Sequence, residues 1–375
     1  MKKNNIKWII CLLSIVIVFC VSNVGTKIFG GFASVAATND TIKIGAVFHL
    51  TGAGAFWGIG EQNGTQMAID EVNMSGGING KKISLILEDG ATDFTKTANS
   101  IQKLINVDGT KAIIGPTWFG QAASPLAKQF KAIIISPSAG VVPESNKYFF
   151  DVWPTEKQEV MPVVRYMQEK GVKNVAIIYS QNDFSQSVRN NFIEQAKILG
   201  INVIKEFSVN PNESDFKTII LQLKNLKIDA VYGTFAFYPS QGAYSKQAKE
   251  LGLNLALYSS SGTEIPDLVK SYPEVEGTIY GYIAMGPKEA NFYSKYQTKF
   301  NSFPSPSASY AYDATNLIIE AIKAGNETPE QISSYLMGVK YSGVANDISF
   351  DSNGRIANKT FIIKTVKDGK FVEIK

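Results

Sequence analysis

Residues 64–89 read GTQMAIDEVNMSGGINGKKISLILED, and this stretch decides the fold. Its first part has the pattern of an amphipathic helix that ends near Asn73, and Ile83–Leu87 is an apolar run typical of a strand. Between them lie Gly76-Gly77-Ile78-Asn79-Gly80, and glycine tolerates the positive φ angles that such a turn requires. The stretch therefore predicts the helix-to-strand connection of an α/β fold.

The same alternation of apolar runs and helical patterns extends from Thr41 to the end of the chain. The predicted strands are Ile42–Val47, Ile83–Leu87, Lys111–Ile114, Ala132–Ile135, Asn174–Tyr179, Asn202–Phe207, Ala230–Thr234 and Leu255–Tyr258. The predicted helices after the first are Lys96–Val107, Gln121–Phe130, Lys157–Glu169, Phe184–Leu199, Phe216–Leu226, Ser240–Leu251, Ser309–Ala324 and Pro329–Met337. This order predicts two open, doubly wound α/β lobes, with any ligand held by the loops that follow the strands.

Local signals refine the ends of some of these elements. Asp93 or Thr95 is expected to cap the helix that begins near Lys96, because both side chains accept hydrogen bonds from backbone N–H groups. Asp368-Gly369 predicts a tight hairpin turn near the C-terminus. The prolines at 266, 273, 287, 304 and 306 predict turns and a change of organisation in that part of the chain.

Charge and cysteine content limit the classes of function. The chain has 375 residues, with 37 Lys and Arg, 33 Asp and Glu, and one His. Four of the lysines lie in residues 1–37, which hold no acid, so 33 basic and 33 acidic residues remain beyond them. A neutral body argues against nucleic acid as a partner, because phosphate contacts need a basic surface. Cys11 and Cys20 also lie in this leader, so we expect no disulfide, metal or cofactor in the remainder.

Residues 1–37 have the order of an export signal. Three lysines among the first seven residues precede the apolar run Trp8–Val21, and Ser34–Ala37 supplies small residues for a signal peptidase. The alternative is a retained membrane anchor, because Ile6–Val24 spans about 19 residues and ~20 cross a bilayer. In both cases the body of the protein is exported, to the periplasm or to the outer face of the cell membrane.

Motifs of catalysis are scarce. The chain holds no G-x-S-x-G, no H-E-x-x-H and no Walker lysine motif. The glycines between Gly52 and Gly60 follow the first predicted strand, as in a dinucleotide-binding site, but they lack the G-x-G-x-x-G spacing. Glu88 and Asp89 end the second strand, where a ribose would bind. A dehydrogenase is therefore only a weak alternative. We therefore expect a protein that is not an enzyme. His49 ends the first strand and is either a hydrogen-bond donor at a cleft or a packed loop residue.

The opening stretch resembles the signature of the leucine/isoleucine/valine-binding-protein family. The residues that carry the resemblance are Asn73, Gly76, Gly77, Ile78, Gly80 and Asp89. Further matches follow in family order across residues 42–375, at Ile113–Pro116, Ser136–Ala139, Asp351 with Gly354, and Asp368–Lys370. Each motif is weak by itself, but the ordered set is specific.

The resemblance implies a type I periplasmic binding fold, in which two lobes are joined by three crossings and close on a small solute by hinge motion. The implied crossings lie near Asp151–Glu156, Ile283–Pro287 and Tyr341–Asn346. Lobe 1 then comprises residues 42–153 plus 286–341, and lobe 2 comprises 154–285 plus 342–375. The implied partners are a small-molecule ligand and the membrane permease of an ABC uptake transporter, with the binding protein itself a monomer. A membrane-tethered ligand-sensing receptor is the alternative.

The resemblance also implies which residues line the ligand site. They are Trp57, Trp118, Phe119, Ser138, Gly140, Phe184, Phe237 and Ser261. In amino-acid-binding members, hydroxyl residues that hold the carboxylate stand where this chain has Phe119 and Gly140. Two tyrosines of the cleft become Phe184 and Phe237, and the acid that pairs with the ammonium group becomes Ser261.

These differences bear on the ligand. Phenylalanine side chains cannot stabilise the charges of an amino acid that loses its hydration in a closed cleft. Glu264, three residues after Ser261, is a candidate to replace the acid that pairs with the ammonium group. Backbone N–H groups near Gly120 or Ser185 could still hold an anion at a helix start. We predict a ligand more apolar or aromatic than an aliphatic amino acid. Two alternatives stay open: the aromatic side chains fill the space between the lobes, or the cleft still binds an ordinary amino acid.

Overall fold

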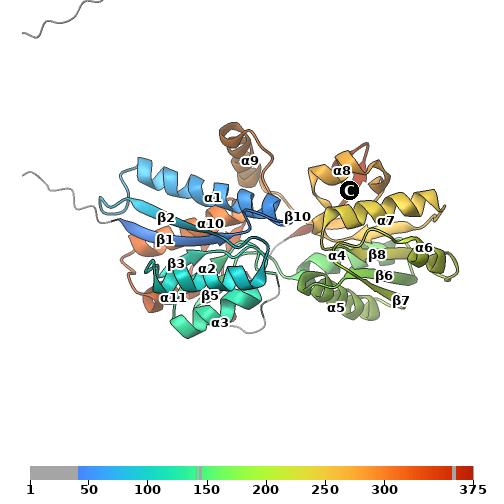
Figure 1. Cartoon of the computed structure of the whole chain (residues 1–375), viewed down its shortest axis with the longest axis horizontal. Coiled ribbons are helices and arrows are strands. Elements are labelled where there is room, and N and C mark those ends of the chain that lie inside the picture. Colours follow the sequence, from blue (N-terminus) through green and yellow to red (C-terminus); the bar gives the residue numbers. More distant parts are fainter. Residues whose placement is uncertain (1–40, 141, 143–145, 357–359, 375) are drawn as a thin grey trace, which may run out of the picture. The chain divides into compact units, whose positions relative to one another are not determined.

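The computed structural model describes residues 41–140, 142, 146–356 and 360–374, which form two α/β lobes (Figure 1). The export leader or anchor predicted for residues 1–37 lies outside the described residues. In the part of the chain that is described, no helix is long and apolar enough to cross a membrane.

Within the described residues, lobe 1 is built on a five-stranded parallel sheet with the order β2-β1-β3-β4-β5. Its strands are β1 (Ile42–Phe48), β2 (Ile83–Asp89), β3 (Ala112–Ile114), β4 (Ile133–Ser136) and β5 (Phe149–Asp151). Its helices are α1 (Ala55–Met74), α2 (Phe94–Asn106), α3 (Gly120–Phe130), α9 (Pro287–Phe300), α10 (Ala308–Lys323) and α11 (Pro329–Gly338). The central strands β3 and β4 are wholly buried, as expected for a parallel sheet covered by helices.

Lobe 2 is built on a seven-stranded sheet, counted over the same described ranges, with the order β14-β13-β10-β9-β8-β6-β7. Its strands are β6 (Asn174–Ser180), β7 (Asn202–Val209), β8 (Ala230–Thr234), β9 (Ala256–Ser259), β10 (Ile279–Ile283), β13 (Phe361–Lys367) and β14 (Lys370–Glu373). Its helices are α4 (Glu156–Glu169), α5 (Asp183–Ile198), α6 (Lys217–Lys224), α7 (Tyr238–Glu250) and α8 (Pro266–Ser271), with short 3₁₀ turns at Ser261–Thr263 and Pro273–Val275. The strands from β7 to β10 pair in parallel, and β13 and β14 are antiparallel.

The side chains of β6 show how both faces of the second sheet are covered. Val175 and Ile177 pack in the cluster that holds α4 and α5, while Ala176 and Ile178 pack in the cluster that holds α6 and α7. Successive residues of a strand point to opposite faces, so a strand covered on both sides is apolar throughout. The continuous apolar run in the sequence is therefore explained by helices on both faces.

Two connections within the described residues carry the chain from one lobe to the other. β5 ends at Asp151 before α4 begins at Glu156, and β10 ends at Ile283 before α9 begins at Pro287. The last boundary differs from the predicted Tyr341–Asn346. The hydrophobic core of lobe 1 includes the later side chains Ala345, Ile348, Phe350 and Ile356. The chain enters the second sheet only with β13, so we propose residues 41–153 with 286–356 for lobe 1, and 154–285 with 360–374 for lobe 2.

Several local predictions can be compared with the structure. Asp93, not Thr95, caps α2, and its carboxylate accepts from the Lys96 N–H at 2.7 Å. The glycines that follow α1 take positive φ, as do both residues of the Asp368-Gly369 turn, which joins β13 to β14. The turns predicted at Pro266 and Pro287 are wrong, because both prolines begin helices, where a missing N–H costs nothing.

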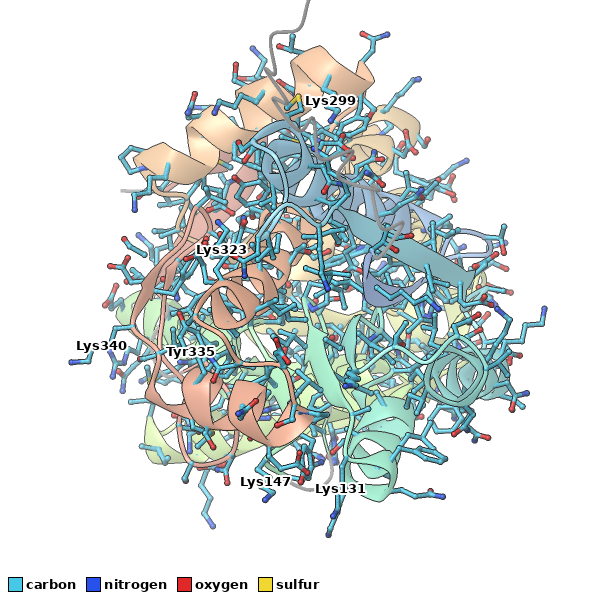
Figure 2. All side chains as sticks on the ribbon, turned by 90° about the vertical axis from the view of Figure 1, so that its left-hand side faces the viewer. Lys131, Lys147, Lys299, Lys323, Tyr335 and Lys340 are labelled. Carbon is cyan, nitrogen blue, oxygen red and sulfur yellow. The ribbon has the colours of Figure 1, made fainter. Side chains whose placement is uncertain are left out.

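Charged side chains are spread over the surface. In Figure 2, Lys131, Lys147 and Lys340 extend outward from lobe 1, and all three are exposed. Exposed lysines keep their ammonium groups hydrated, so they add solubility without bringing charge into the lobe cores.

Candidate functional site

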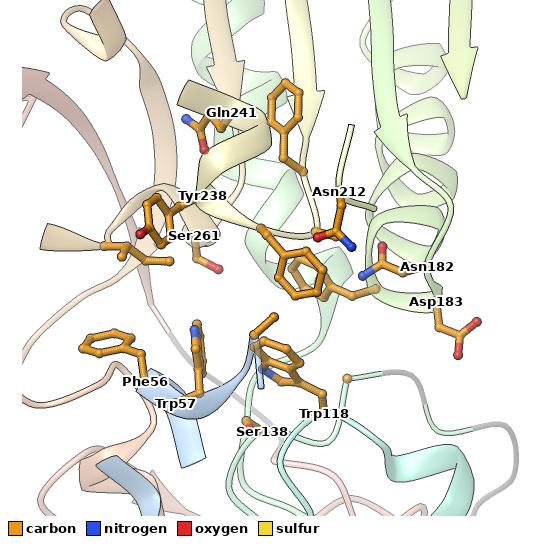
Figure 3. A pocket seen from close by; sticks show the side chains of 18 of the residues that line it. Phe56, Trp57, Trp118, Ser138, Asn182, Asp183, Asn212, Tyr238, Gln241 and Ser261 are labelled. Carbon is orange, nitrogen blue, oxygen red and sulfur yellow. The ribbon is translucent and has the colours of Figure 1, made fainter. Parts of the chain in front are cut away.

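A cavity of about 500 Å³ lies between the lobes, where the loops after the parallel strands meet (Figure 3). Lobe 1 contributes loops that follow β1, β3 and β4, and lobe 2 contributes loops that follow β6, β7, β8 and β9. Small-molecule sites typically enclose ~300–1,000 Å³, and open α/β sheets bind ligands at the carboxyl ends of their strands. The cavity thus has the size and the place of a ligand site.

All eight positions predicted from the sequence line this cavity. They are Trp57, Trp118, Phe119, Ser138 and Gly140 from lobe 1, and Phe184, Phe237 and Ser261 from lobe 2. The fold brings together residues that are up to about two hundred positions apart, because each follows a strand of one of the two sheets. Their role in ligand binding stays a prediction.

Tryptophan rings form the lobe 1 wall. Trp57 is 9 % exposed and meets Trp118 edge-to-face at 5.9 Å between ring centroids, and Trp153 at 5.6 Å. Edge-to-face aromatic pairs are favourable by roughly 0.5–1.5 kcal/mol beyond the burial of their surface. The rings therefore support one another, and the wall offers a ligand a preformed apolar surface.

The backbone of Trp118 is held in an uncommon conformation. Its φ is +61°, in the left-handed region, which costs a residue other than glycine roughly 1–3 kcal/mol. The Trp118 N–H donates to the Ser138 carbonyl at 2.9 Å, and Gly120 donates to the Trp118 carbonyl at 3.0 Å. Gly140 also has a positive φ, and a Cβ there would lie 3.1 Å from the Trp118 carbonyl oxygen. Glycine at position 140 thus lets the two loops approach closely enough to hold Trp118.

Ser138 is linked to a buried carboxyl behind the wall. Its hydroxyl donates to Glu61 Oε1 at 2.5 Å, and Thr117 donates to the other oxygen of Glu61. Burial raises the Glu61 pKa from 4.5 to about 7, although hydrogen bonds from Ser138, Thr117 and Ser307 lower it. Ser138 itself is 2 % exposed, so it presents only a small polar surface to the cavity.

Ser261 has a matching arrangement in lobe 2. Its backbone N–H donates to Glu159 Oε1 at 2.6 Å. Burial raises the Glu159 pKa to about 7, and the nearby Glu156 raises it further. Each lobe therefore holds one buried carboxyl one serine away from the cavity.

Two backbone donors at the helix starts predicted to hold an anion are already used by the chain itself. The Gly120 N–H donates to the carbonyls of Trp118 and Ala139, and the Ser185 N–H donates to Asn182 Oδ1 at 3.1 Å. An anionic ligand at these helix starts, which stays a prediction, would have to use other N–H groups near them.

A family model for periplasmic binding proteins matches residues 41–370. The chain belongs to the periplasmic binding protein family. It is 25 % identical over 357 residues to the leucine-, isoleucine-, valine-, threonine- and alanine-binding protein of Pseudomonas aeruginosa, covering 92 % of this chain and 95 % of that one. The predicted resemblance to the leucine/isoleucine/valine-binding-protein family is therefore confirmed.

Two solved structures of transporter binding proteins resemble it in fold. The branched-chain amino acid transporter substrate-binding protein LivJ of Streptococcus pneumoniae, in complex with isoleucine, has a TM-score of 0.80 and 25 % identity, covering 90 % of this chain and 100 % of that one. The solute-binding protein of an ABC transporter from Rhodopseudomonas palustris BisB5, in complex with 3,4-dihydroxybenzoic acid, has a TM-score of 0.78 and 25 % identity, covering 89 % and 96 %. One fold thus accepts aliphatic and aromatic ligands in different relatives.

Two other residues singled out in the sequence, Glu264 and Asp89, do not line the cavity and contact other parts of the protein. Glu264 is paired with Lys364 Nζ at 2.5 Å and accepts from the Tyr280 hydroxyl at 2.7 Å, so it does not replace the acid lost at Ser261. Asp89 accepts from the N–H groups of Leu50 and Ala91 and from the hydroxyl of Thr51, which organises a loop and leaves no ribose site.

His49 is a packed residue. It is fully buried, and its ring lies 5.5 Å from Trp118 and 4.8 Å from Phe119 between centroids. Within the described residues neither ring nitrogen has a hydrogen-bond partner, and burial lowers the His49 pKa to about 4. A neutral His49 therefore supports the two aromatic residues from behind.

Sequence reasoning missed much of the polar and aromatic lining of lobe 2. Asn182, Asp183, Asn212, Tyr238 and Asp267 also line the cavity. The first two precede the predicted Phe184 in the sequence, and Tyr238 follows Phe237. These three could have been predicted as cavity residues, because they are sequence neighbours of predicted positions. Asn212 lies in an irregular segment after β7, and Asp267 lies in the first turn of the short helix α8, where too few residues follow for a periodicity to predict the direction of a side chain.

Proposed function

We propose that the protein is the exported solute-binding component of an ABC uptake transporter, and that its lobes close on a small apolar or aromatic compound. The aromatic cavity between the lobes is the observation that carries the proposal. Relatives named as binding proteins of amino acids and of an aromatic acid support solute binding over catalysis. The permease in the membrane is the proposed partner.

The eight cavity residues have two proposed roles. Trp57, Trp118, Phe119, Phe184 and Phe237 provide apolar faces for the body of the solute, while Ser138 and Ser261 hydrogen-bond to its polar group. Gly140 acts through the backbone of Trp118. Contact across the cleft is already present between Trp118 and Phe237, whose ring centroids are 6.5 Å apart. A flat apolar solute between these two walls would be covered by both lobes.

Native mass spectrometry of freshly purified protein, followed by a thermal-shift panel, tests the proposal. A site-specific ligand at about 100 times its Kd stabilises the folded state by roughly 2.7 kcal/mol. We expect an aromatic solute to raise Tm and leucine, isoleucine or valine to leave it unchanged. If the branched-chain amino acids alone raise Tm, solute binding stands and the proposed ligand class is wrong. Mass measurement of the mature N-terminus tests whether the leader is removed.

A further inference from the structure

We propose that the cleft takes an organic cation, a small apolar or aromatic body that carries an ammonium group and no carboxylate. The inference rests on the proposed solute-binding function and narrows the class of solute. Three observations support it: the charges on the cavity wall, the buried carboxyls behind the wall, and the aromatic lining.

The charges on the cavity wall all have one sign. Asp183 and Asp267 line the cavity from lobe 2, and no Lys, Arg or His is among the described residues that line it. Both aspartates are exposed, and they come from different elements, α5 and α8. A carboxylate in the cleft would meet like charge and no basic side chain, whereas an ammonium group would meet two opposite charges.

At pH 8, above their pKa of about 7, the buried carboxyls add negative charge behind both walls. Glu61 and Glu159 are buried, and neither has a cationic partner in the described part of the chain. Ser138 donates its hydroxyl proton to Glu61, and the backbone N–H of Ser261 donates to Glu159. A serine hydroxyl that donates inward keeps only acceptor lone pairs for the cavity. Ser138 therefore favours a ligand that donates, as an ammonium N–H does.

The aromatic lining suits a cation as well as an apolar body. Trp57 and Trp118 lie on one side of the cavity and Tyr238 on the other, as Figure 3 shows. A cation is attracted to the face of an aromatic ring within about 6 Å of its centroid, and tryptophan is the strongest partner. The cavity thus combines ring faces with carboxylates, which together select a positive charge on a hydrophobic solute.

The competing effect is the positive end of helices. α1, α3, α5 and α7 all begin at the cavity, and a helix N-terminus acts like roughly half a positive charge. At α5 this end is offset by Asp183 in the first turn, and the N–H groups of Gly120 and Ser185 are taken by the chain itself. At pH 8, Asp267 and the two buried glutamates together carry more negative charge than the partial positive charges that remain at the other helix ends.

A series of probes with one body and different charge tests the inference. Isothermal titration of the wild-type protein at pH 8 and low salt would compare 2-phenylethylammonium, 2-phenylethanol and 3-phenylpropionate. We expect the ammonium to bind at least about tenfold more tightly than the carboxylate, with the alcohol between them. The N-trimethylated form of 2-phenylethylammonium distinguishes two sources of affinity. It keeps the positive charge that the aromatic rings attract, but it has no N–H group to donate to a serine oxygen.

Paired variants locate the selectivity. Replacing both wall aspartates, Asp183→Asn with Asp267→Asn, should reduce the ammonium-to-carboxylate ratio about threefold or more. Glu250→Gln removes an exposed acid of lobe 2 that does not line the cavity, and it should leave the ratio unchanged.

Equal or tighter binding of 3-phenylpropionate would overturn the cation inference and leave solute binding intact. Failure of the whole series to bind would also overturn it. Native mass spectrometry of a co-purified solute would then decide the proposed function separately.

Discussion

The two walls of the cleft differ in chemistry, although both are made of loops that follow parallel strands. The lobe 1 wall is dominated by Phe56, Trp57, Trp118 and Phe119, and it holds no charged side chain among the described lining residues. The lobe 2 wall adds amides and two aspartates to its own aromatic residues. In lobe 1 the Glu61 carboxyl is bonded to Ser138 and lies outside the lining.

This difference suggests a division of labour. A rigid apolar wall gains affinity from burial of the ligand body and discriminates weakly between ligands of similar shape. Amide and carboxylate groups on the other wall discriminate by charge and hydrogen bonding, because an unmatched polar group in a closed cleft is costly. We therefore expect lobe 1 to contribute most of the affinity and lobe 2 most of the selectivity.

The largest expected effect is on the stability of lobe 2. Phe192 belongs to α5, the helix that begins at Asp183; it is fully buried and stacks on Tyr232 of β8, with ring centroids 4.0 Å apart. Phe192→Ala should lower the free energy of unfolding by about 3–5 kcal/mol, because it leaves a cavity in the core. Urea denaturation followed by circular dichroism measures this.

Tryptophan fluorescence in the same experiment reports the unfolding of lobe 1 separately from that of lobe 2. Trp57, Trp118 and Trp153 all belong to the core or cavity wall of lobe 1. The control Phe303→Ala, at a side chain that is 45 % exposed, should change the free energy of unfolding by less than about 0.5 kcal/mol. Comparable losses in both variants would contradict the packing of lobe 2 described above.

The next effect concerns affinity at the two walls. Trp118→Ala should weaken binding of 2-phenylethylammonium roughly thirtyfold, or about 2 kcal/mol, because it removes the ring that both lobes contact. Phe237→Ala in lobe 2 should cost less, roughly fivefold. Isothermal titration measures both, with circular dichroism to confirm that the variants fold. A larger loss at Phe237 would reverse the proposed division of labour.

A third test uses pH and the buried carboxyl of lobe 1. The pKa of Glu61 is raised to about 7 by burial, from an ordinary 4.5, so folding takes up a proton between these values. The free energy of unfolding should fall as pH rises from 4.5 to 7. Asp151, Glu159 and Asp313, whose pKa values burial also raises to about 7, act in the same direction. His49, with its pKa lowered to about 4, opposes them.

Glu61→Gln should flatten this dependence by at most about 1.4 kcal/mol per pH unit, the value for one proton. Urea denaturation at several pH values from 5 to 7.5 measures the slope. Glu250→Gln, at an exposed acid, serves as the control and should keep the wild-type slope. An unchanged slope in Glu61→Gln would mean that Glu61 keeps an ordinary pKa in the folded protein.

The smallest effect is the response to salt. Asp183 and Asp267 are exposed, so their attraction for a bound ammonium group should be screened as the Debye length shortens. We expect the Kd of 2-phenylethylammonium to rise about threefold between 50 and 500 mM NaCl, and the double Asn variant to respond less. A fall in Kd with salt would indicate that burial outweighs charge at the lobe 2 wall.

Much of the fold could be predicted because its signals are local. Parallel strands such as β3 and β4 are buried on both sides and therefore appear in the sequence as continuous apolar runs. Asp93 indicates a helix start because its side chain accepts a backbone hydrogen bond. Asp368-Gly369 indicates a turn because both residues tolerate a positive φ. α9 was missed, because Pro287 reads as a breaker unless the helix after it is known. The last crossing is hard to place from the sequence, because apolar side chains such as Ile348 and Phe350, which pack in the core of lobe 1, would suit the core of either lobe.

The sequence by itself determined the alternation of strands and helices, the place of the site after the strands, and the phenylalanines that replace polar family positions. These follow from periodicity and from residue type, which act over a few neighbouring positions. Only the tertiary structure decided how those residues are used. Glu61 and Ser138 are 77 positions apart, and their hydrogen bond exists only because a helix and a loop after a distant strand pack together. The same packing occupies the Gly120 N–H and pairs Glu264 with Lys364, since contacts between distant segments depend on the fold as a whole.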